Sequence, residues 1–487
     1  MSAVYFLHPF WSLLRKIRFW RKASFGSALI AATFGGATQS GHAAQATSTP
    51  RPNILLLVAD DLGWDDVGYH SSEIRTPNLD RLCREGVELD RFYVAPVCSP
   101  TRAGLLTGRY PLRYGLMHWP IAPYDTHGLP GKETTLPEML ATVGYKRRGL
   151  VGKWHLGHAT REFYPLSQGF THFTGHLNGY IDYFSLTREG QRDWHRQWQS
   201  SGEQGYLTDL EADAAVDFLT GCSTANPFFL FVAFSAAHTP LQAPPDAIAG
   251  YRDLPEPRKT YAAMVTRMDE AIGRIVGTLE SKGFAENTLL IFISDNGGSV
   301  PGGAKNQPLR GGKAQTFEGG IRVPALMRWP AGLKGGRRVQ TPVAYIDLLP
   351  TLARLTAAKI DWPIDGQEAW DIITGRVSQR PGPLFSFVGT ERNERLAVMQ
   401  DGWKLVRTGQ TILQPAAKAK PQILLFRIED DPLEQHDLSA QEPERVAAML
   451  EQARQFRSLQ PPGIKMHTGG DANKPPGWSA PKNWQLE

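Results

Sequence analysis

NILLLVADD, residues 53 to 61, decides the fold, because a continuous apolar run of this length is typical of a strand buried on both faces of a sheet. The run ends in two aspartates. Three later apolar runs also end in polar side chains: YKRRGLVGKWHLGH (145–158), FFLFVAFSAAHTP (228–240) and NTLLIFISDNGG (287–298). The repeated pattern predicts four strands of one sheet.

Amphipathic segments separate these strands. Helices are predicted over TPNLDRLCREG (76–86), LPEMLATVG (136–144) and YAAMVTRMDEAIGRIVGTLESKG (261–283), the last closed by Gly283 as a C-cap. Strands that alternate with helices form a mainly parallel sheet covered on both faces, so the sequence predicts an α/β fold. Ligands of such sheets bind beyond the carboxyl ends of the strands, where the polar residues should gather.

The character of the sequence changes near residue 380. Short strands are predicted at PLFSFVG, RLAVMQ, WKLVR and ILLFRI, with Asp401-Gly402 as a hairpin turn, and a helix is predicted over 442–458 before a Pro- and Gly-rich tail. We therefore expect a catalytic domain over 52–378. A small C-terminal α+β subdomain with an antiparallel sheet, and its tail, should occupy 379–487.

The first 44 residues have the anatomy of a signal peptide. A basic stretch precedes the apolar run FGSALIAATFGGAT (25–38), and small residues then suit cleavage after Ala43, Ala44 or Ala46. The run is shorter than the ~20 residues that a bilayer-spanning helix needs, although an uncleaved anchor stays an alternative. We expect an exported protein, periplasmic or secreted, with 45–51 as a linker and with no stable membrane span.

Net charge gives no support for a nucleic-acid partner. The chain carries +5 at pH 7, from 53 basic and 48 acidic residues. Five of the basic residues lie in the first 44 positions, which hold no acidic residue, so the rest of the chain has 48 of each sign. The exported protein is therefore close to neutral.

Cys98 lies in an unusual context, within APVCSPTRAGLLTGR (95–109). Ser99 as an N-cap and Pro100 in the first turn would begin a helix whose positive end faces the thiol. A cysteine so placed is either a nucleophile with a lowered pKa or an inert apolar residue. The other two, Cys83 and Cys222, either pair in an oxidising compartment or stay free thiols.

Acidic residues at two strand ends offer an oxygen-only metal site. Asp60 and Asp61 follow the first strand, and Asp295 and Asn296 follow the fourth. Three carboxylates and an amide oxygen suit calcium or magnesium rather than zinc. Taken singly, the aspartate pair also reads as a helix cap, and SDNGG as a tight turn.

Basic groups at the same edge suit an anion. Lys153 and His155 follow the second strand, His238 follows the third, and Lys313 lies in LRGGKAQTFEGG. Each alone reads as an ordinary polar loop residue. Their joint occurrence beside the acidic pair, with Arg102 one helical turn beyond the cysteine, favours an active site for a tetrahedral oxyanion.

Cys98-Ser99-Pro100-Thr101-Arg102 resembles the C-x-P-x-R signature of type I sulfatases, whose cysteine a maturation enzyme oxidises to formylglycine. The similarity continues through DDLGWDDVG, GKWHLG, AAHTPLQAP, SDNGG, RGGK and FEGGIRVP and ends at LFRIEDDPLEQHDL, so it covers residue 52 to about 440. It implies an alkaline-phosphatase-like large domain and an enzyme that hydrolyses sulfate monoesters.

The resemblance also implies roles for single residues. Converted Cys98, hydrated to a geminal diol, would be the nucleophile. One calcium ion, with magnesium as the alternative, would be bound by an oxygen of this residue and by Asp60, Asp61, Asp295 and Asn296. The family's sulfate-binding and proton-transfer positions are matched by Arg102, Lys153, His155, His238 and Lys313.

GLMHW (115–119) and GHLNGYIDYFS (175–185) look similar to the arylsulfatase B branch, which removes 4-sulfate from N-acetylgalactosamine in glycosaminoglycans. The resemblance implies a sulfated carbohydrate or aryl sulfate as substrate and the formylglycine-generating enzyme as partner. Four aromatic residues either stack on sugar faces or belong to the core: Trp119, Trp154, Tyr180 and Tyr183.

Two other functions stay open at this point. One is a phosphate or phosphonate ester hydrolase of the same superfamily. Its two-zinc members need D-x-x-x-H or D-H pairs, which these strand ends lack, whereas formylglycine-dependent phosphonate hydrolases are harder to separate from sulfatases. The other is a non-catalytic binder of sulfated glycans in which Cys98 stays a thiol.

Overall fold

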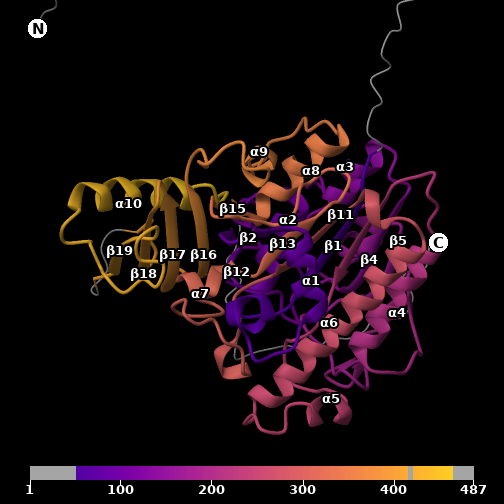
Figure 1. Cartoon of the computed structure of the whole chain (residues 1–487). Helices are drawn as coiled ribbons and strands as arrows, with labels where there is room; N and C mark the ends of the chain where they lie inside the picture. Colours follow the sequence, from indigo (N-terminus) through magenta and orange to yellow (C-terminus); the bar gives the residue numbers. More distant parts are fainter. Residues whose placement is uncertain (1–50, 415–419, 464–487) are drawn as a thin grey trace, which may run out of the picture. The chain divides into compact units, whose positions relative to one another are not determined.

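The computed structural model describes residues 51–414 and 420–463. Its centre is a ten-stranded sheet with the order β14-β2-β13-β11-β1-β10-β4-β5-β8-β9 (Figure 1). The four strands predicted from the sequence are neighbours in it: β11 (Thr288–Ser294), β1 (Asn53–Ala59), β10 (Phe228–Ala233) and β4 (Arg147–Lys153). The pairings between them are all parallel, as predicted.

Other strands extend this parallel centre on both sides. β5 (His172–His176) pairs parallel with β4, and β8 (His195–Arg196) and β9 (Gln199–Ser200) continue antiparallel. Next to β11 lie β13 (Ala325–Arg328), β2 (Val87–Leu89) and β14 (Arg337–Val339). Short strands form two further sheets: β12 (Arg322–Val323), β3 (Phe92–Tyr93) and β15 (Val343–Ala344) in one, β6 (Thr187–Arg188) and β7 (Gln191–Arg192) in the other.

Helices cover both faces of the large sheet (Figure 1). Leu55 and Leu57 of β1 belong to the apolar core that contains α1 (Pro77–Glu85), α4 (Leu207–Thr220) and α6 (Arg258–Ser281). Leu56 and Val58 point to the opposite core, with α2 (Cys98–Thr107), α3 (Leu136–Thr142) and α8 (Leu348–Thr356). Burial of one such side chain contributes about 1.5–3 kcal/mol, which explains why β1 is apolar from Ile54 to Ala59.

The three helices predicted from amphipathic segments are confirmed as α1, α3 and α6. The last begins three residues earlier than predicted, at Arg258, and Gly283 follows its end with a φ of +72°. Short helices also form: α5 (Pro245–Ala249), α7 (Glu318–Ile321) and α9 (Trp370–Ile373).

The prediction that Ser99 caps a helix is wrong. α2 begins at Cys98, and its N-cap is Val97. The Ser99 hydroxyl instead donates to the carbonyl of His155 (3.0 Å) and accepts from the amide of Ile121 (3.1 Å). These two contacts tie the start of α2 to the loop after β4 and to the segment that contains Ile121.

The C-terminal region contains the antiparallel sheet that the sequence predicts. β16 (Leu384–Thr390), β17 (Asn393–Gln400), β18 (Trp403–Gly409) and β19 (Gln422–Arg427) follow one another as a meander, and α10 (Pro443–Arg457) follows them. Asp401 and Gly402 both have positive φ, of 50° and 76°, as a two-residue hairpin turn requires. Leu396 and Leu405 join the same core as α2, so the division between residues 378 and 379 stays a prediction.

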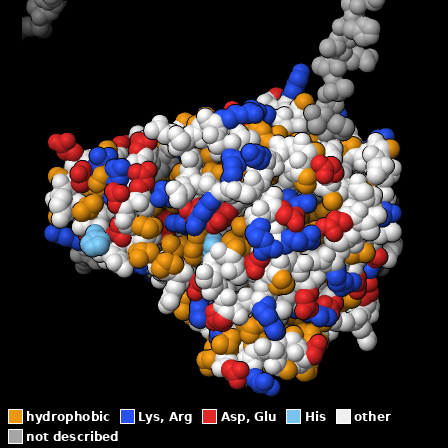
Figure 2. All heavy atoms as spheres, viewed as in Figure 1, with side chains coloured by type: hydrophobic (Ala, Val, Ile, Leu, Met, Phe, Trp, Pro, Cys, Tyr) orange, Lys and Arg blue, Asp and Glu red, His pale blue; other side chains and the backbone are white. Residues whose placement is uncertain are grey.

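The predicted signal peptide and the Pro- and Gly-rich tail lie outside the described residues. Within the described ranges, no helix is both long enough and apolar enough to cross a bilayer. Cys83, Cys98 and Cys222 are all free thiols. Figure 2 shows acidic and basic side chains interspersed on the face in view, in keeping with the balanced charge of the chain.

Candidate active site

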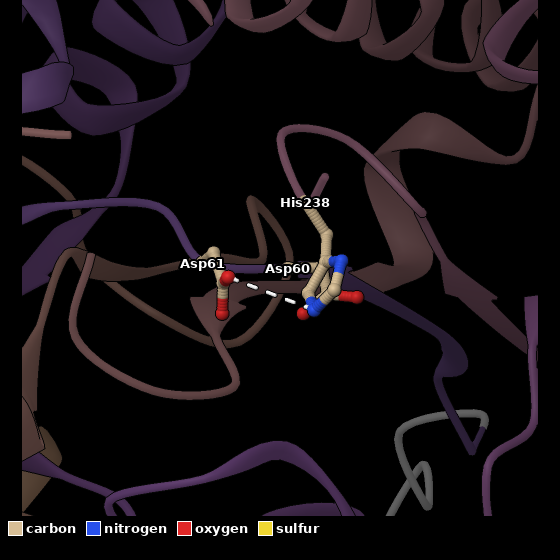
Figure 3. Close-up of side chains that lie close together, drawn as sticks. All are labelled: Asp60, Asp61 and His238. Atoms are coloured by element: carbon tan, nitrogen blue, oxygen red, sulfur yellow. Dashed lines mark ion pairs between the residues drawn. The ribbon is translucent and has the colours of Figure 1, made fainter. Parts of the chain in front are cut away.

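Polar residues from the ends of the four parallel strands lie together at one edge of the sheet. Asp60 and Asp61 follow β1 directly, and Lys153 is the last residue of β4. His238 lies on the loop after β10, and it offers a ligand atom within 4.8 Å of ligand atoms on both aspartates (Figure 3). Asp295 follows β11 and accepts from the amide of Asp61 at 3.5 Å. The convergence expected for a parallel sheet therefore occurs.

Helix α2 adds Cys98 and Arg102 to this edge. The Arg102 guanidinium is almost fully buried and donates through Nε and Nη2 to Oδ2 of Asp295, at 3.0 and 2.8 Å. Its Nη1 donates to the carbonyl of Lys153 at 2.9 Å, and the Lys153 ammonium in turn donates to Asp60. A chain of alternating charges therefore fixes the positions of the two cations.

His155 presents an unprotonated nitrogen to Cys98. Its Nε2 lies 2.8 Å from the carbonyl of Ile121, which can only accept, so Nε2 carries the proton of the neutral ring. Its Nδ1 lies 3.3 Å from the Cys98 sulfur with a free lone pair. Burial and the neighbouring Lys153 lower the pKa of His155, which keeps the ring neutral.

The Cys98 thiol is a poor nucleophile as it stands. It is 2% exposed, and burial raises its pKa although Lys153 and Lys313 act in the opposite direction. Burial therefore acts against the lowered pKa that the start of the helix suggested for the unmodified thiol. The thiolate is the reactive form of cysteine, so a buried neutral thiol needs another form of activation.

Asp61 lies at the centre of the second group of charges. Its carboxylate accepts from Lys313 at 2.7 Å and from the side-chain amide of Asn296 at 2.7 Å. Burial raises the pKa of Asp61, but Lys313 and His238 outweigh burial and hold it below the ordinary value. Asp61 is therefore ionised, and the sequence alternative of a helix cap does not describe it.

His238 directs one ring nitrogen into the site. Its Nδ1 donates to the carbonyl of Thr239 at 2.6 Å, and its Nε2 lies 3.7 Å from Oδ2 of Asp61. Burial, followed by the charge of Lys313, lowers the pKa of His238 to about 3. An anion bound beside this ring would favour the protonated form.

The acidic residues fit a hard cation. Oδ1 of Asp60 and Oδ1 of Asn296 are buried and have no hydrogen-bond partner in the described part of the chain. A buried polar atom without a partner costs about 1–3 kcal/mol, and carboxylate and amide oxygens are the ligands that calcium prefers. Burial and the neighbouring Asp60 raise the pKa of Asp295 to about 6, and a cation would reverse that shift.

A buried network behind the β10 loop was not predicted from the sequence. The Glu211 carboxyl on α4 contacts the amide and hydroxyl of Ser235 at 3.1 and 2.7 Å, and this hydroxyl lies 2.8 Å from Nε2 of His176. Nδ1 of His176 donates to the carbonyl of Asn178. The neutral His176 ring therefore accepts the Ser235 proton, and the Glu211 carboxyl must donate one to Ser235.

The predicted aromatic residues occupy different environments. Trp154 and Tyr183 are 1% exposed, and the Tyr183 hydroxyl donates to the carbonyls of Ser235 and His238 at 2.6 and 3.0 Å, so both belong to the core. Trp119 is half-buried. Tyr180 is 38% exposed, and its ring stacks on His238.

The fold and the family comparison define the class of the protein: an ester hydrolase with the alkaline-phosphatase-like fold. The chain belongs to the sulfatase family, whose model, described as Sulfatase, matches residues 52–358, and it is a sulfuric ester hydrolase. It is 34% identical to arylsulfatase J of Mus musculus over 471 residues, or 85% of this chain and 77% of that protein. It is 35% identical to N-acetylgalactosamine-6-sulfatase of Homo sapiens over 366 residues, or 69% of each protein.

A solved structure shares the fold at similar identity. Ps i-CgsB in complex with k-i-k-neocarrahexaose matches with a TM-score of 0.78 and 32% identity, over 86% of this chain and 95% of that chain. The fold expected from the sequence resemblance is confirmed.

Proposed function

We propose that this sulfatase removes sulfate from a sulfated sugar, with formylglycine at position 98 and one calcium ion as its cofactors. The observation that carries the proposal is the position of Cys98, whose buried thiol lies 3.3 Å from Nδ1 of His155, near two buried cations, Arg102 and Lys153. Oxidised to formylglycine and hydrated, residue 98 would supply a diol, of which one hydroxyl attacks the ester sulfur and the other later expels sulfate.

Arg102, Lys153 and Lys313 would bind the sulfate oxygens. All three are already held by carboxylates, through Asp295, Asp60 and Asp61 respectively. Positions fixed in this way require little reorganisation as negative charge develops on the sulfate, which is the condition for electrostatic stabilisation of a transition state.

The two histidines would divide the proton transfers. His155 faces residue 98 with the unprotonated Nδ1, so it acts as the base when the second hydroxyl expels sulfate. His238 directs Nε2 toward Asp61 at the mouth of the site, so it acts as the acid that protonates the departing alcohol, with Lys313 beside it.

Calcium would be held by Asp60, Asp61, Asp295 and Asn296, with magnesium as the alternative ion. Bound there, it would neutralise charge on the sulfate and make a hydroxyl of residue 98 more acidic. The two buried oxygens without partners support this assignment.

The relatives support a sugar substrate. The names of the proteins most similar to this chain include N-acetylgalactosamine-6-sulfatase and arylsulfatase J, and Ps i-CgsB was solved with k-i-k-neocarrahexaose. We propose a substrate like N-acetylgalactosamine sulfate and an aryl sulfate as an artificial substrate. The formylglycine-generating enzyme would be the maturation partner, and the protein would act after export.

A comparison of esters tests the reaction class. Protein produced together with a formylglycine-generating enzyme should hydrolyse 4-nitrophenyl sulfate faster than 4-nitrophenyl phosphate or a phosphonate or phosphate diester. Faster turnover of a phosphorus ester would favour the hydrolase alternative. Binding of sulfated glycans without turnover of any ester would favour the non-catalytic binder.

Replacement of His238 tests the assigned acid. His238→Ala should slow release of a sugar alcohol far more than release of nitrophenolate, because only the poor leaving group needs a proton. Equal losses of kcat for the two substrates would show that His238 does not act as the acid.

A further inference from the structure

Tyr180 lies next to His238, and Arg188 lies next to Tyr180. The Tyr180 ring stacks on the His238 ring with 5.5 Å between centroids and 22° between planes. The Arg188 guanidinium lies 3.7 Å from the centre of the Tyr180 ring. Because His238 faces the departing alcohol in the proposed reaction, Tyr180 and then Arg188 are the side chains that extend outward from the acid on this side.

The charge of Arg188 is poorly satisfied within the protein. Its one ion pair in the described chain is with Glu189, an exposed neighbour at 3.5 Å, and its buried Nε has no hydrogen-bond partner there. The side chain is 13% exposed. A guanidinium without a strong internal partner offers a flat fork of donors to an anionic group, and carboxylates and sulfates fit such a fork.

The segment that carries both residues is held firmly against the β10 loop. The Asp182 carboxylate accepts from the amide of Ser185 at 2.7 Å and from the side chain of Gln242 at 2.7 Å. The Tyr183 hydroxyl donates to the carbonyl of His238 itself. Glu189 and Gly190, with φ of 51° and 78°, close a two-residue turn between β6 and β7 that fixes the position of Arg188.

We propose that Tyr180 and Arg188 form a subsite for the leaving alcohol that selects sulfated saccharides bearing a second anionic group, a carboxylate or a further sulfate. The second group lies on the sugar that loses its sulfate or on the adjacent sugar. Arg188 binds it, and Tyr180 holds the guanidinium in place while its exposed edge contacts the sugar. This inference rests on the proposed function and specifies its substrate class.

Matched substrates test the subsite. N-acetylgalactosamine 4-sulfate and 6-sulfate are compared with the 4,6-disulfate, and unsaturated chondroitin sulfate disaccharides are compared with their uronate methyl esters. The wild type should prefer the doubly charged member of a pair by about 10- to 100-fold in kcat/KM, the range expected for a charge-assisted hydrogen bond. Arg188→Gln should remove this preference and leave 4-nitrophenyl sulfate turnover within about twofold.

The control is Arg196→Gln, which removes an exposed arginine paired with Glu203 and should keep the preference. The preference should also shrink as salt screens the contact. The subsite is overturned if the wild type prefers the singly charged saccharides, cleaves both kinds equally well or cleaves no saccharide. It is also overturned if Arg188→Gln lowers the turnover of the doubly charged saccharide and of 4-nitrophenyl sulfate equally. Failure of the proposed function itself is distinct, since 4-nitrophenyl sulfate would then also remain intact.

Discussion

Two residues of the site have a positive φ, a backbone conformation that residues other than glycine rarely adopt. Asp61 has a φ of 60° and His155 a φ of 57°. Each lies two residues beyond the end of a strand, β1 for Asp61 and β4 for His155. Such conformations cost about 1–3 kcal/mol each and persist where the surrounding contacts hold them. At these two positions the backbone directs the Asp61 carboxylate toward Lys313 and the His155 imidazole toward Cys98, so the strain serves the geometry of the site.

Two replacements of Glu211 test whether the site needs its hydrogen bonds or its negative charge. Glutamine reproduces a protonated carboxyl, because it accepts from the Ser235 amide and donates to the Ser235 hydroxyl, so Glu211→Gln should keep kcat within about threefold. Glu211→Ala frees the loop that carries His238 and should lower kcat by about 100-fold. Steady-state kinetics with a sugar sulfate measures both variants. A glutamine variant as impaired as the alanine variant would contradict a neutral Glu211.

The pKa of Glu211 predicts a pH effect on stability. Burial raises this pKa from 4.5 to about 8, with the hydrogen bond from the Ser235 amide acting in the opposite direction. Between these pH values the unfolded chain loses the proton and the folded chain keeps it, so stability falls as pH rises, by at most about 1.4 kcal/mol per pH unit. Above the folded pKa the loss is complete and constant.

In the Glu211→Gln variant, residue 211 does not titrate, so this loss of stability with rising pH is absent. Urea unfolding of the wild type and the variant at several pH values should show the variant gaining relative stability from about pH 5 to 8. A difference between the two proteins that does not change with pH would show that Glu211 titrates normally.

At the scale of elements, one buried lysine joins the C-terminal sheet to the segment that follows Lys313. Lys404 on β18 donates to Glu318 on α7, at 2.9 Å, and lies 2.9 Å from Glu434, beyond β19. All three side chains are buried. The amide of Glu318 also donates to the Glu434 carboxylate at 2.8 Å, so this cluster fixes the end of the loop on which Lys313 lies.

Lys404→Met should be strongly destabilising. Removal of the ammonium takes the cation away from the buried Glu434 carboxylate and leaves Glu318 with only Arg322, at 3.7 Å, as a cationic partner. Loss of one partner of a buried ion pair costs about 3–5 kcal/mol. The matched control is Arg81→Ala, which breaks an exposed pair with Glu280 and should cost less than about 1 kcal/mol. Denaturant unfolding measures both. Equal losses in the two variants would contradict a structural role for the cluster.

The sequence predicted the elements better than the contacts between them. The apolar run of β1 and the hairpin at Asp401 were predictable because strand burial and turn chemistry are local properties. The role of Ser99 was not, because its partners His155 and Ile121 lie far along the chain. Glu211 left one signal, a glutamate among buried residues on an amphipathic helix, which indicates a buried polar contact but not its partner.

The whole molecule brings residues from across the chain to one edge of a sheet, and like charges gather there. Asp60, Asp61 and Asp295 are all buried, and Lys153, Lys313 and Arg102 match them in number, but Oδ1 of Asp60 and Oδ1 of Asn296 still lack hydrogen-bond partners in the described chain. A cation at this edge would therefore stabilise the entire fold as well as the site, because it binds the folded chain and not the unfolded one.

Calcium should raise the melting temperature of the whole protein. At a concentration 100 times its dissociation constant the ion adds about 2.7 kcal/mol, and a chelator should remove this gain. Asn296→Ala should weaken the response, whereas Asn226→Ala, at an exposed position, should not. Differential scanning calorimetry with calcium and with chelator measures the effect. Identical melting curves for the wild type in the two conditions would contradict a calcium site.

The most direct test of the central claim is mass spectrometry of the tryptic peptide FYVAPVCSPTR, residues 92–102, from protein that is active on 4-nitrophenyl sulfate. The account predicts that an aldehyde replaces the thiol of Cys98, and that the activity of a preparation rises in proportion to the converted fraction. An active preparation in which residue 98 is entirely unmodified cysteine would contradict it.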